Sequence, residues 1–136
     1  MSVKDYHDIL VEIADIDIEV SSIADSRRLL AELNEKEEAL IQLKKSVIVD
    51  MRSIESDHLK KKRMIMDKYQ QQNSGIIGVF RGSNKSRRIK ALKRQDTDNQ
   101  GEIESYSEIK CMIDDLMGQL DNIKGSMNDF IKEKLG

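Results

Sequence analysis

Residues 75–86, GIIGVFRGSNKS, contain the glycine, lysine and serine residues from which phosphate-binding loops are made. In such a loop, backbone N–H groups and a Lys that directly follows Gly hold the phosphates of a nucleotide. Here two residues, Ser83 and Asn84, stand between the last glycine and Lys85, and no apolar strand precedes the segment. The spacing therefore argues against a nucleotide site.

Residues 96–107, DTDNQGEIESYS, imitate a calcium-binding loop. Asp96 and Asp98 occupy the first and third places of the loop, and Gly101 occupies the sixth. The twelfth place of such a loop supplies a bidentate carboxylate, but here it is Ser107. Without that ligand we expect no metal site, and the sequence gives no reason to expect a cofactor.

Side chains that serve as nucleophiles, bases or metal ligands are few and scattered. The chain has two histidines, His7 and His58, and one cysteine, Cys111. None of them has the spacing of a zinc site or of a nucleophile paired with a base. A lone Cys cannot form an internal disulfide, and free cysteines are usually buried. We therefore expect the protein not to be an enzyme and Cys111 to be a buried structural thiol.

Charge is distributed unevenly along the chain, although the net charge is −2. Residues 1–58 hold seven Lys and Arg against fourteen Asp and Glu, and residues 96–136 hold four against ten. Between them, residues 59–95 hold twelve basic residues and one acidic residue, Asp67. Clustered positive charges repel one another, so this segment points to an anionic partner.

The composition indicates an all-α protein. Charged residues make up 35% of the chain and aromatic residues 4%, and there is no Pro. Few large side chains are present to fill a round core, whereas charge-rich helices can run long when Pro is absent. No stretch approaches the ~18 to 20 consecutive apolar residues that cross a bilayer, and the start lacks a basic leader before an apolar run. We expect a cytoplasmic protein, with peripheral attachment to a membrane left open.

Apolar residues recur at alternating steps of four and three, which is the heptad pattern of helices that pack against other helices. The cleanest run consists of Ile109, Ile113, Leu116, Leu120, Ile123, Met127 and Phe130. A second run extends over residues 9–54, and a glycine-containing segment separates the two. We therefore predict one domain over residues 1–136, a long antiparallel helical hairpin or coiled coil. Its predicted parts are arm one at 4–71, a tip loop at 73–84 and arm two at 85–134.

Arm two contains a segment whose composition disfavours a helix. Asp, Asn and Gly accumulate over residues 95–104, and no apolar residue appears between Leu92 and Ile103. Such a composition is typical of a loop or kink. We expect a break in the helix near residues 96–101.

The arms are unequal, because at ~1.5 Å per residue arm one would span ~100 Å and arm two ~75 Å. Two arrangements of the N-terminal surplus are open. In the first, the helix is continuous and offers a seam to a protein partner or a second copy, made of Ile9, Ile13, Ile16, Val20 and Ile23. In the second, the chain breaks near residues 20–26 and a third short helix folds back, with Asp25 or Ser26 capping a helix that begins at Arg27. The heptad phase runs through the segment, which favours the continuous helix.

The tip segment carries more apolar side chains than a reversal between helices requires, since such a reversal takes about two to five residues. These side chains either cover the end of the hairpin or form a contact surface. The predicted tip interaction residues are Ile76, Ile77, Val79, Phe80 and Arg81. The predicted anion-binding residues around them are Lys60, Lys61, Lys62, Arg63, Lys85, Arg87, Arg88, Lys90, Lys93 and Arg94.

Two functions fit this layout. The first is a non-enzymatic scaffold or adaptor that binds protein partners through its heptad seams and engages an anionic or apolar surface with its basic tip. That surface is a membrane or a groove in a partner. The second is a nucleic-acid-binding helical protein that uses residues 59–95. Tyr69 and Phe80 are the aromatic residues of that segment, fewer than single-strand binding usually employs. No small-molecule substrate is expected.

Overall fold

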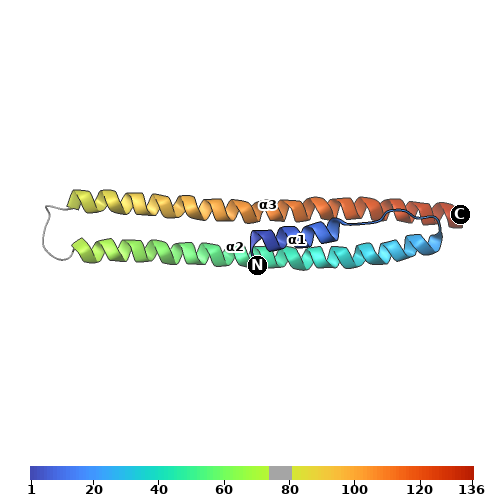
Figure 1. The fold of residues 1–136 in the computed structure, drawn as a ribbon, viewed down its shortest axis with the longest axis horizontal. Helices are drawn as coiled ribbons and strands as arrows, with labels where there is room; N and C mark the ends of the chain where they lie inside the picture. The colour runs from blue at the N-terminus through green and yellow to red at the C-terminus, as the bar shows by residue number, and fades with distance from the viewer. Residues whose placement is uncertain (74–80) are drawn as a thin grey trace. The chain divides into compact units, whose positions relative to one another are not determined.

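The protein is a long antiparallel helical hairpin with a short additional helix at its N-terminus (Figure 1). The computed structural model describes residues 1–73 and 81–136, with side chains over 1–68 and 85–136. Over these residues the elements are α1 (Val3–Ala14), α2 (Ile23–Asn73) and α3 (Arg81–Leu135). The predicted all-α hairpin is confirmed. The predicted tip loop at 73–84 overlaps both long helices, because residue 73 belongs to α2 and residues 81–84 belong to α3; residues 74–80 lie outside the described residues.

The chain divides into two compact units, which are described separately. Unit 1 comprises Met1–Ile48 and Ser107–Gly136, and unit 2 comprises Val49–Tyr106. In each unit a segment of α2 pairs with a segment of α3 running in the opposite direction (Figure 1). The prediction of a single domain over the whole chain stays a prediction.

Unit 1 holds the fully buried side chains of the described part of the chain. From α2 the apolar ones are Leu33, Leu40 and Val47, and from α3 they are Ile109, Ile113 and Leu120, all 0% exposed. The α3 residues belong to the heptad run that the sequence shows, so that run is the core-facing side of the helix. Helix α1 adds Tyr6, Leu10 and Ile13 to the same core.

Helix α1 is a separate element with defined ends. Ser2 and Asp5 form a capping box, in which the Ser2 hydroxyl accepts from the Asp5 N–H at 3.2 Å and the Asp5 carboxylate accepts from the Ser2 N–H at 3.0 Å. The helix runs antiparallel to α2 and parallel to α3 (Figure 1). At its C-terminal end the Lys36 ammonium donates to the carbonyl oxygens of Ile13 at 2.9 Å and Asp15 at 2.6 Å. These bonds satisfy carbonyl groups that a helix end leaves without partners.

The predicted continuous first helix is therefore wrong, and the alternative with a third N-terminal helix is confirmed. The position and the capping residue differ from that alternative, because the non-helical segment covers residues 15–22 and α2 begins at Ile23 rather than Arg27. The hydroxyl of Ser22 accepts a hydrogen bond from the Asp25 N–H at 3.1 Å. Ser26 is buried inside the first turns and donates its hydroxyl to the Ser22 carbonyl at 3.1 Å. Ser22 thus caps α2, as serine commonly does.

The predicted break near residues 96–101 is also wrong, since α3 is helical from Arg81 to Leu135 without interruption. Local hydrogen bonds hold this segment in the helix: Thr97 Oγ1 donates to the Lys93 carbonyl at 3.0 Å, and Gln100 Nε2 donates to Glu104 at 3.2 Å. Gly101 lowers helix propensity by ~1 kcal/mol relative to Ala. His58 and Lys62 of α2 also contact Asp96 in the same stretch.

Unit 2 is built differently from unit 1. Among its described side chains none is fully buried, and the positions that face the partner helix are half-buried. They include Met51 and Ile54 on α2 and Leu92 and Ile103 on α3. Two helices alone cannot enclose a core, and polar contacts between α2 and α3 add to the half-buried apolar positions of this unit.

Candidate functional site

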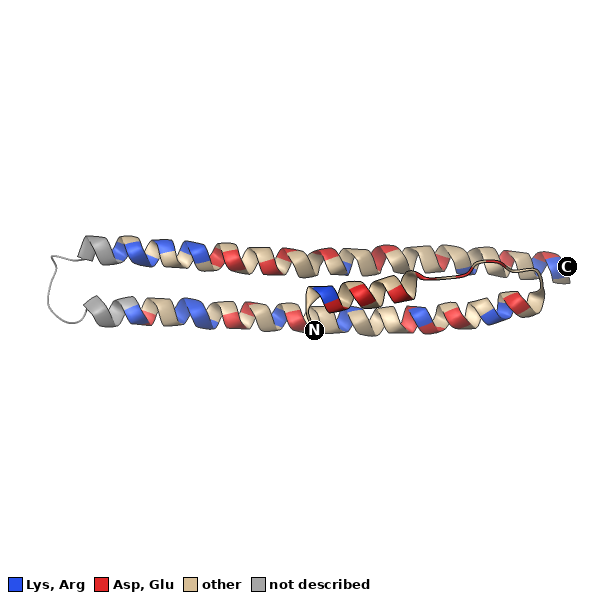
Figure 2. Ribbon diagram, in the orientation of Figure 1, with Lys and Arg blue, Asp and Glu red and all other residues tan. Residues whose placement is uncertain are grey.

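The basic residues of unit 2 lie on both helices of the hairpin. Figure 2 shows Lys and Arg gathered on α2 at residues 60–63 and on α3 at residues 85–94. Eight of the ten predicted anion-binding side chains are exposed, whereas Lys62 and Arg88 are half-buried. We call this set the basic end. Its members lie on both helices of unit 2.

One polar cluster fixes the two helices at the edge of the basic end. The Asp96 Oδ1 atom on α3 accepts from the Lys62 ammonium at 2.6 Å and lies 3.1 Å from His58 Nε2. Gln95 Nε2 lies 3.3 Å from the other ring nitrogen, Nδ1 of His58. Because the carboxylate accepts and the amide N–H donates, these neighbours suit an imidazole that carries its proton on Nε2.

The cluster is partly enclosed. The His58 side chain is 11% exposed and that of Lys62 is 34% exposed, whereas Asp96 is 53% exposed. The hydrogen bond from Lys62 is the main cause that lowers the pKa of the Asp96 carboxyl below its ordinary value, and His58 adds to the effect. Asp96 therefore stays ionised and neutralises part of the charge of Lys62.

This cluster changes the interpretation of Lys62 and of Asp96. Lys62 was predicted to bind an anionic partner, but its ammonium already holds a carboxylate of the same chain. Asp96 occupies the first place of the calcium-like sequence, but in the structure its carboxylate joins α3 to α2. Sequence reasoning missed the pairing, although an acid opposite a histidine and a lysine in an antiparallel hairpin is a detectable signal.

Four of the five predicted tip interaction residues belong to the segment 74–80. Ile76, Ile77, Val79 and Phe80 lie outside the described residues. Arg81 begins α3, and its side chain is likewise not among those described. Their role at the tip stays a prediction.

The five residues predicted as a partner seam do not share one helix. Ile9 and Ile13 are on α1, Ile16 and Val20 are in the segment that joins α1 to α2, and Ile23 is the first residue of α2. Ile13 is buried in the core of unit 1, and the other four are half-buried. Their contact with a partner stays a prediction.

Other chemical features of the described residues are few. Over residues 1–73 and 81–136, no three or more His, Cys, Asp or Glu side chains gather as metal ligands would. No helix in that part of the chain has both the length and the apolar character needed to cross a membrane.

Cys111 is exposed, so the prediction of a buried thiol is wrong. Its position on α3 turns it away from the core that Ile109 and Ile113 enter, because successive helical residues differ by ~100° in direction.

We compared the sequence with protein-family models and with curated proteins, and the structure with solved structures, and none of the three comparisons gave a match.

Proposed function

We propose that the protein is a non-enzymatic helical adaptor whose basic end binds an anionic membrane surface. The observation that supports this proposal is the exposure of basic side chains on two helices that the Asp96 cluster holds side by side. Residues 59–95 carry one acidic side chain, Asp67, among twelve basic ones, so little within the segment neutralises them.

Electrostatics of this kind supplies enough free energy for reversible attachment. Each Lys or Arg near an anionic leaflet contributes ~1 kcal/mol, which decreases as salt screens the charges. Six of the exposed cations of the basic end, if they approach the leaflet together, supply ~6 kcal/mol, which is weak binding on its own. The apolar tip residues Ile77 and Phe80 would add to it, because a buried side chain of this size contributes ~1.5 to 3 kcal/mol.

Co-sedimentation with vesicles tests the proposal. The wild-type protein is expected to sediment with vesicles that contain phosphatidylserine and not with neutral phosphatidylcholine vesicles. Lys60→Glu with Lys61→Glu replaces two exposed cations by anions, so the affinity should fall by at least ~2 kcal/mol, or roughly 30-fold, and repulsion of the new carboxylates by the leaflet should add to the loss. The matched control, Lys45→Glu with Lys132→Glu, makes the same change in net charge at exposed positions of unit 1 and should bind as the wild type does.

The alternative, nucleic-acid binding by residues 59–95, is separated in the same experiments. Replacing Ile77 and Phe80 by Ser should weaken vesicle binding and leave any DNA or RNA gel shift unchanged. Equal sedimentation with neutral and anionic vesicles would contradict the membrane proposal. The nucleic-acid function would be favoured instead if the protein bound neither kind of vesicle but gave a DNA or RNA gel shift that weakened steeply with salt.

A further inference from the structure

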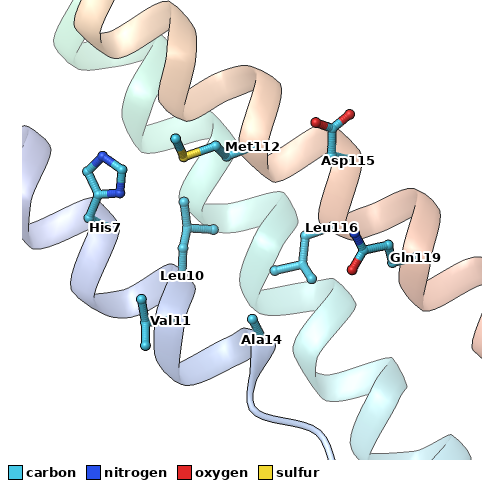
Figure 3. A pocket seen from close by; sticks show the side chains of 8 residues that line it. All are labelled: His7, Leu10, Val11, Ala14, Met112, Asp115, Leu116 and Gln119. Carbon is cyan, nitrogen blue, oxygen red and sulfur yellow. The ribbon is translucent and has the colours of Figure 1, made fainter.

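Unit 1 contains a groove between α1 and α3, with a volume of about 320 Å³, whose lining is mainly apolar and includes His7, Asp115 and Gln119. Figure 3 shows the side chains of Leu10 and Leu116 lying between the two helices, with Met112 reaching over the space from α3. Leu10 and Leu116 are 7% and 8% exposed, whereas Val11 and Met112 at the edges are 71% and 41% exposed. A floor of buried leucines with exposed apolar edges is typical of a place where another side chain docks.

The groove has an acidic edge. Asp115 lines it from α3, and Glu108 is exposed one turn before Met112 on the same helix. Within the part of the chain that the structure describes, Asp115 makes no ion pair, since the nearby Lys44 bonds to Asp114 at 2.6 Å. Unit 1 as a whole holds ten Lys and Arg against seventeen Asp and Glu. An occupant of the groove should therefore be apolar and positively charged.

Unit 2 carries a surface of that kind. Leu59, Arg63 and Met66 follow one another on α2 at steps of four and three, so they share one face of the helix. Leu59 is 59% exposed and Met66 is 51% exposed, which leaves this face open to solvent. Unit 2 holds thirteen Lys and Arg against eight Asp and Glu. We call Leu59, Arg63 and Met66 the basic stripe.

We propose that the groove between α1 and α3 of one copy binds the basic stripe of a second copy. In this contact Leu59 and Met66 cover the apolar edges of the groove, and Arg63 pairs with Asp115. The occupant is a second copy, because the same chain carries both the groove with its acidic edge and an exposed surface with apolar side chains and the opposite charge.

The groove and the stripe are different surfaces, so each contact leaves one groove and one stripe free. Such a contact adds copies in one direction and produces dimers, trimers and longer chains. The area is small, and interfaces below about 1,200 Å² are usually weak and transient. The association is therefore expected at high protein concentration and low salt. It does not depend on the proposed membrane function, although Arg63 belongs to both surfaces.

Sedimentation velocity of the full chain tests the contact. At ~0.01 M salt, where charges act over ~30 Å, the average mass should rise with protein concentration. At ~1 M salt, where they act over ~3 Å, it should stay near that of the monomer. A wild-type protein that remains monomeric at low salt at the highest soluble concentration would overturn the proposal.

Two double variants test the contact, and each removes the apolar side chains of one of its two surfaces. The groove variant is Val11→Ser with Met112→Ser, and the stripe variant is Leu59→Ser with Met66→Ser. All four side chains are exposed, so helix content by circular dichroism should not change. Each variant alone should lose association by at least about tenfold, because one side of every contact is defective.

Mixing the two variants gives the decisive result. The groove variant keeps an intact stripe and the stripe variant keeps an intact groove, so an equimolar mixture should form a 1:1 dimer and nothing larger. A control variant, Val49→Ser with Met64→Ser, removes exposed apolar side chains of α2 outside the stripe and should associate as the wild type does. A mixture that stays monomeric, or a control that loses association equally, would contradict the proposal.

Charge reversal tests the ionic part in the same assay. Arg63→Asp alone and Asp115→Arg alone should each weaken association, because each places like charges in contact. The double variant with both changes in one chain should associate again, since the opposite charges then face each other in exchanged positions. Failure of the double variant to recover would exclude the Arg63 and Asp115 pairing.

Discussion

The ammonium group of Lys36 donates a hydrogen bond to the main-chain carbonyl oxygen of Ile13 at 2.9 Å. The same group donates to the carbonyl of Asp15 at 2.6 Å and lies 3.5 Å from the Glu32 carboxylate. The Lys36 side chain is 15% exposed, so these bonds are shielded from water more than a surface ion pair is. A single side chain of α2 thus fixes the C-terminal end of α1 in unit 1.

Lys36→Met should loosen α1 without unfolding the hairpin. The substitution keeps the length of the side chain but leaves the carbonyls of Ile13 and Asp15 without their donor, at a cost of about 1 to 2 kcal/mol. Urea unfolding would measure the loss, and limited proteolysis should cut residues 15–22 faster than in the wild type. Lys45→Met, at an exposed position of the same helix, should change neither measurement.

Leu40→Ala should destabilise the protein strongly. Leu40 is 0% exposed in the core of unit 1, and removal of a buried Leu side chain typically costs about 2 to 5 kcal/mol through lost contacts and the cavity that remains. Thermal unfolding followed by circular dichroism would report the change. Val49→Ala, at a position of α2 that is 60% exposed, is the control and should shift the midpoint little.

Asp96→Asn should make the stability of unit 2 less dependent on pH. The hydrogen bond from Lys62 lowers the pKa of the Asp96 carboxyl in the folded protein from its ordinary value of 3.8. A carboxyl with a lowered folded-state pKa stabilises the fold above its unfolded pKa, and this contribution is lost as the pH falls through the folded value. The wild type should therefore exceed Asp96→Asn in stability at neutral pH, and the difference should shrink in acid below pH 3.8.

Urea unfolding at a series of pH values would measure that difference. The control is Asp98→Asn, which removes an exposed carboxylate from the same helix. A constant difference between wild type and Asp96→Asn from neutral pH into strong acid would contradict the role given to Asp96.

The same substitution should mainly affect vesicle binding at Lys61 and mainly affect stability at Lys62. Lys61 is exposed, so Lys61→Gln should weaken binding to anionic vesicles by ~1 kcal/mol, or about fivefold, and leave stability unchanged. Lys62 holds Asp96, so Lys62→Gln should change vesicle binding less and should reduce stability slightly, as loss of a partly exposed ion pair does. Vesicle co-sedimentation and urea unfolding of both variants provide the comparison. Identical losses of vesicle binding would show that Lys62 is available to an anion despite its carboxylate partner.

The hairpin could be predicted from the sequence because its signals are periodic and extended. The heptad run of α3 is visible in the sequence, and Ile109, Ile113 and Leu120 from that run are fully buried. Such a run specifies which side of a helix faces its neighbour, and the glycine-containing segment between two runs specifies that the chain reverses. The basic segments of the two arms could likewise be assigned to one end of the hairpin.

The start of α2 was harder to predict, because two local signals disagreed. The heptad phase continues through residues 20–30 and favours one helix, whereas Ser22 with Asp25 three residues later is a capping pattern. In the structure the helix begins at the cap, because the chain before it can then fold back and bury Tyr6, Leu10 and Ile13 against the hairpin. That gain depends on tertiary packing, which the sequence pattern does not reveal.

The continuity of α3 could not be read locally for a similar reason. Residues 96–101 have the composition of a loop, but Asp96 is held by Lys62 and His58 of the other helix. These partners lie far away in sequence, outside the neighbouring residues that determine local helix propensity. The same distance explains why the Asp96 cluster was missed as part of the candidate site.

The uneven burial along α2 has a consequence for the exchange of its amide hydrogens with solvent. Residues 33, 40 and 47 are fully buried, whereas the described side chains of α2 beyond residue 48 are not. Backbone amides exchange when a segment opens locally, and opening is easier where fewer apolar contacts must be broken. The amides of the N-terminal half of α2 should therefore retain their protons much longer than those of its C-terminal half, although both belong to one unbroken helix.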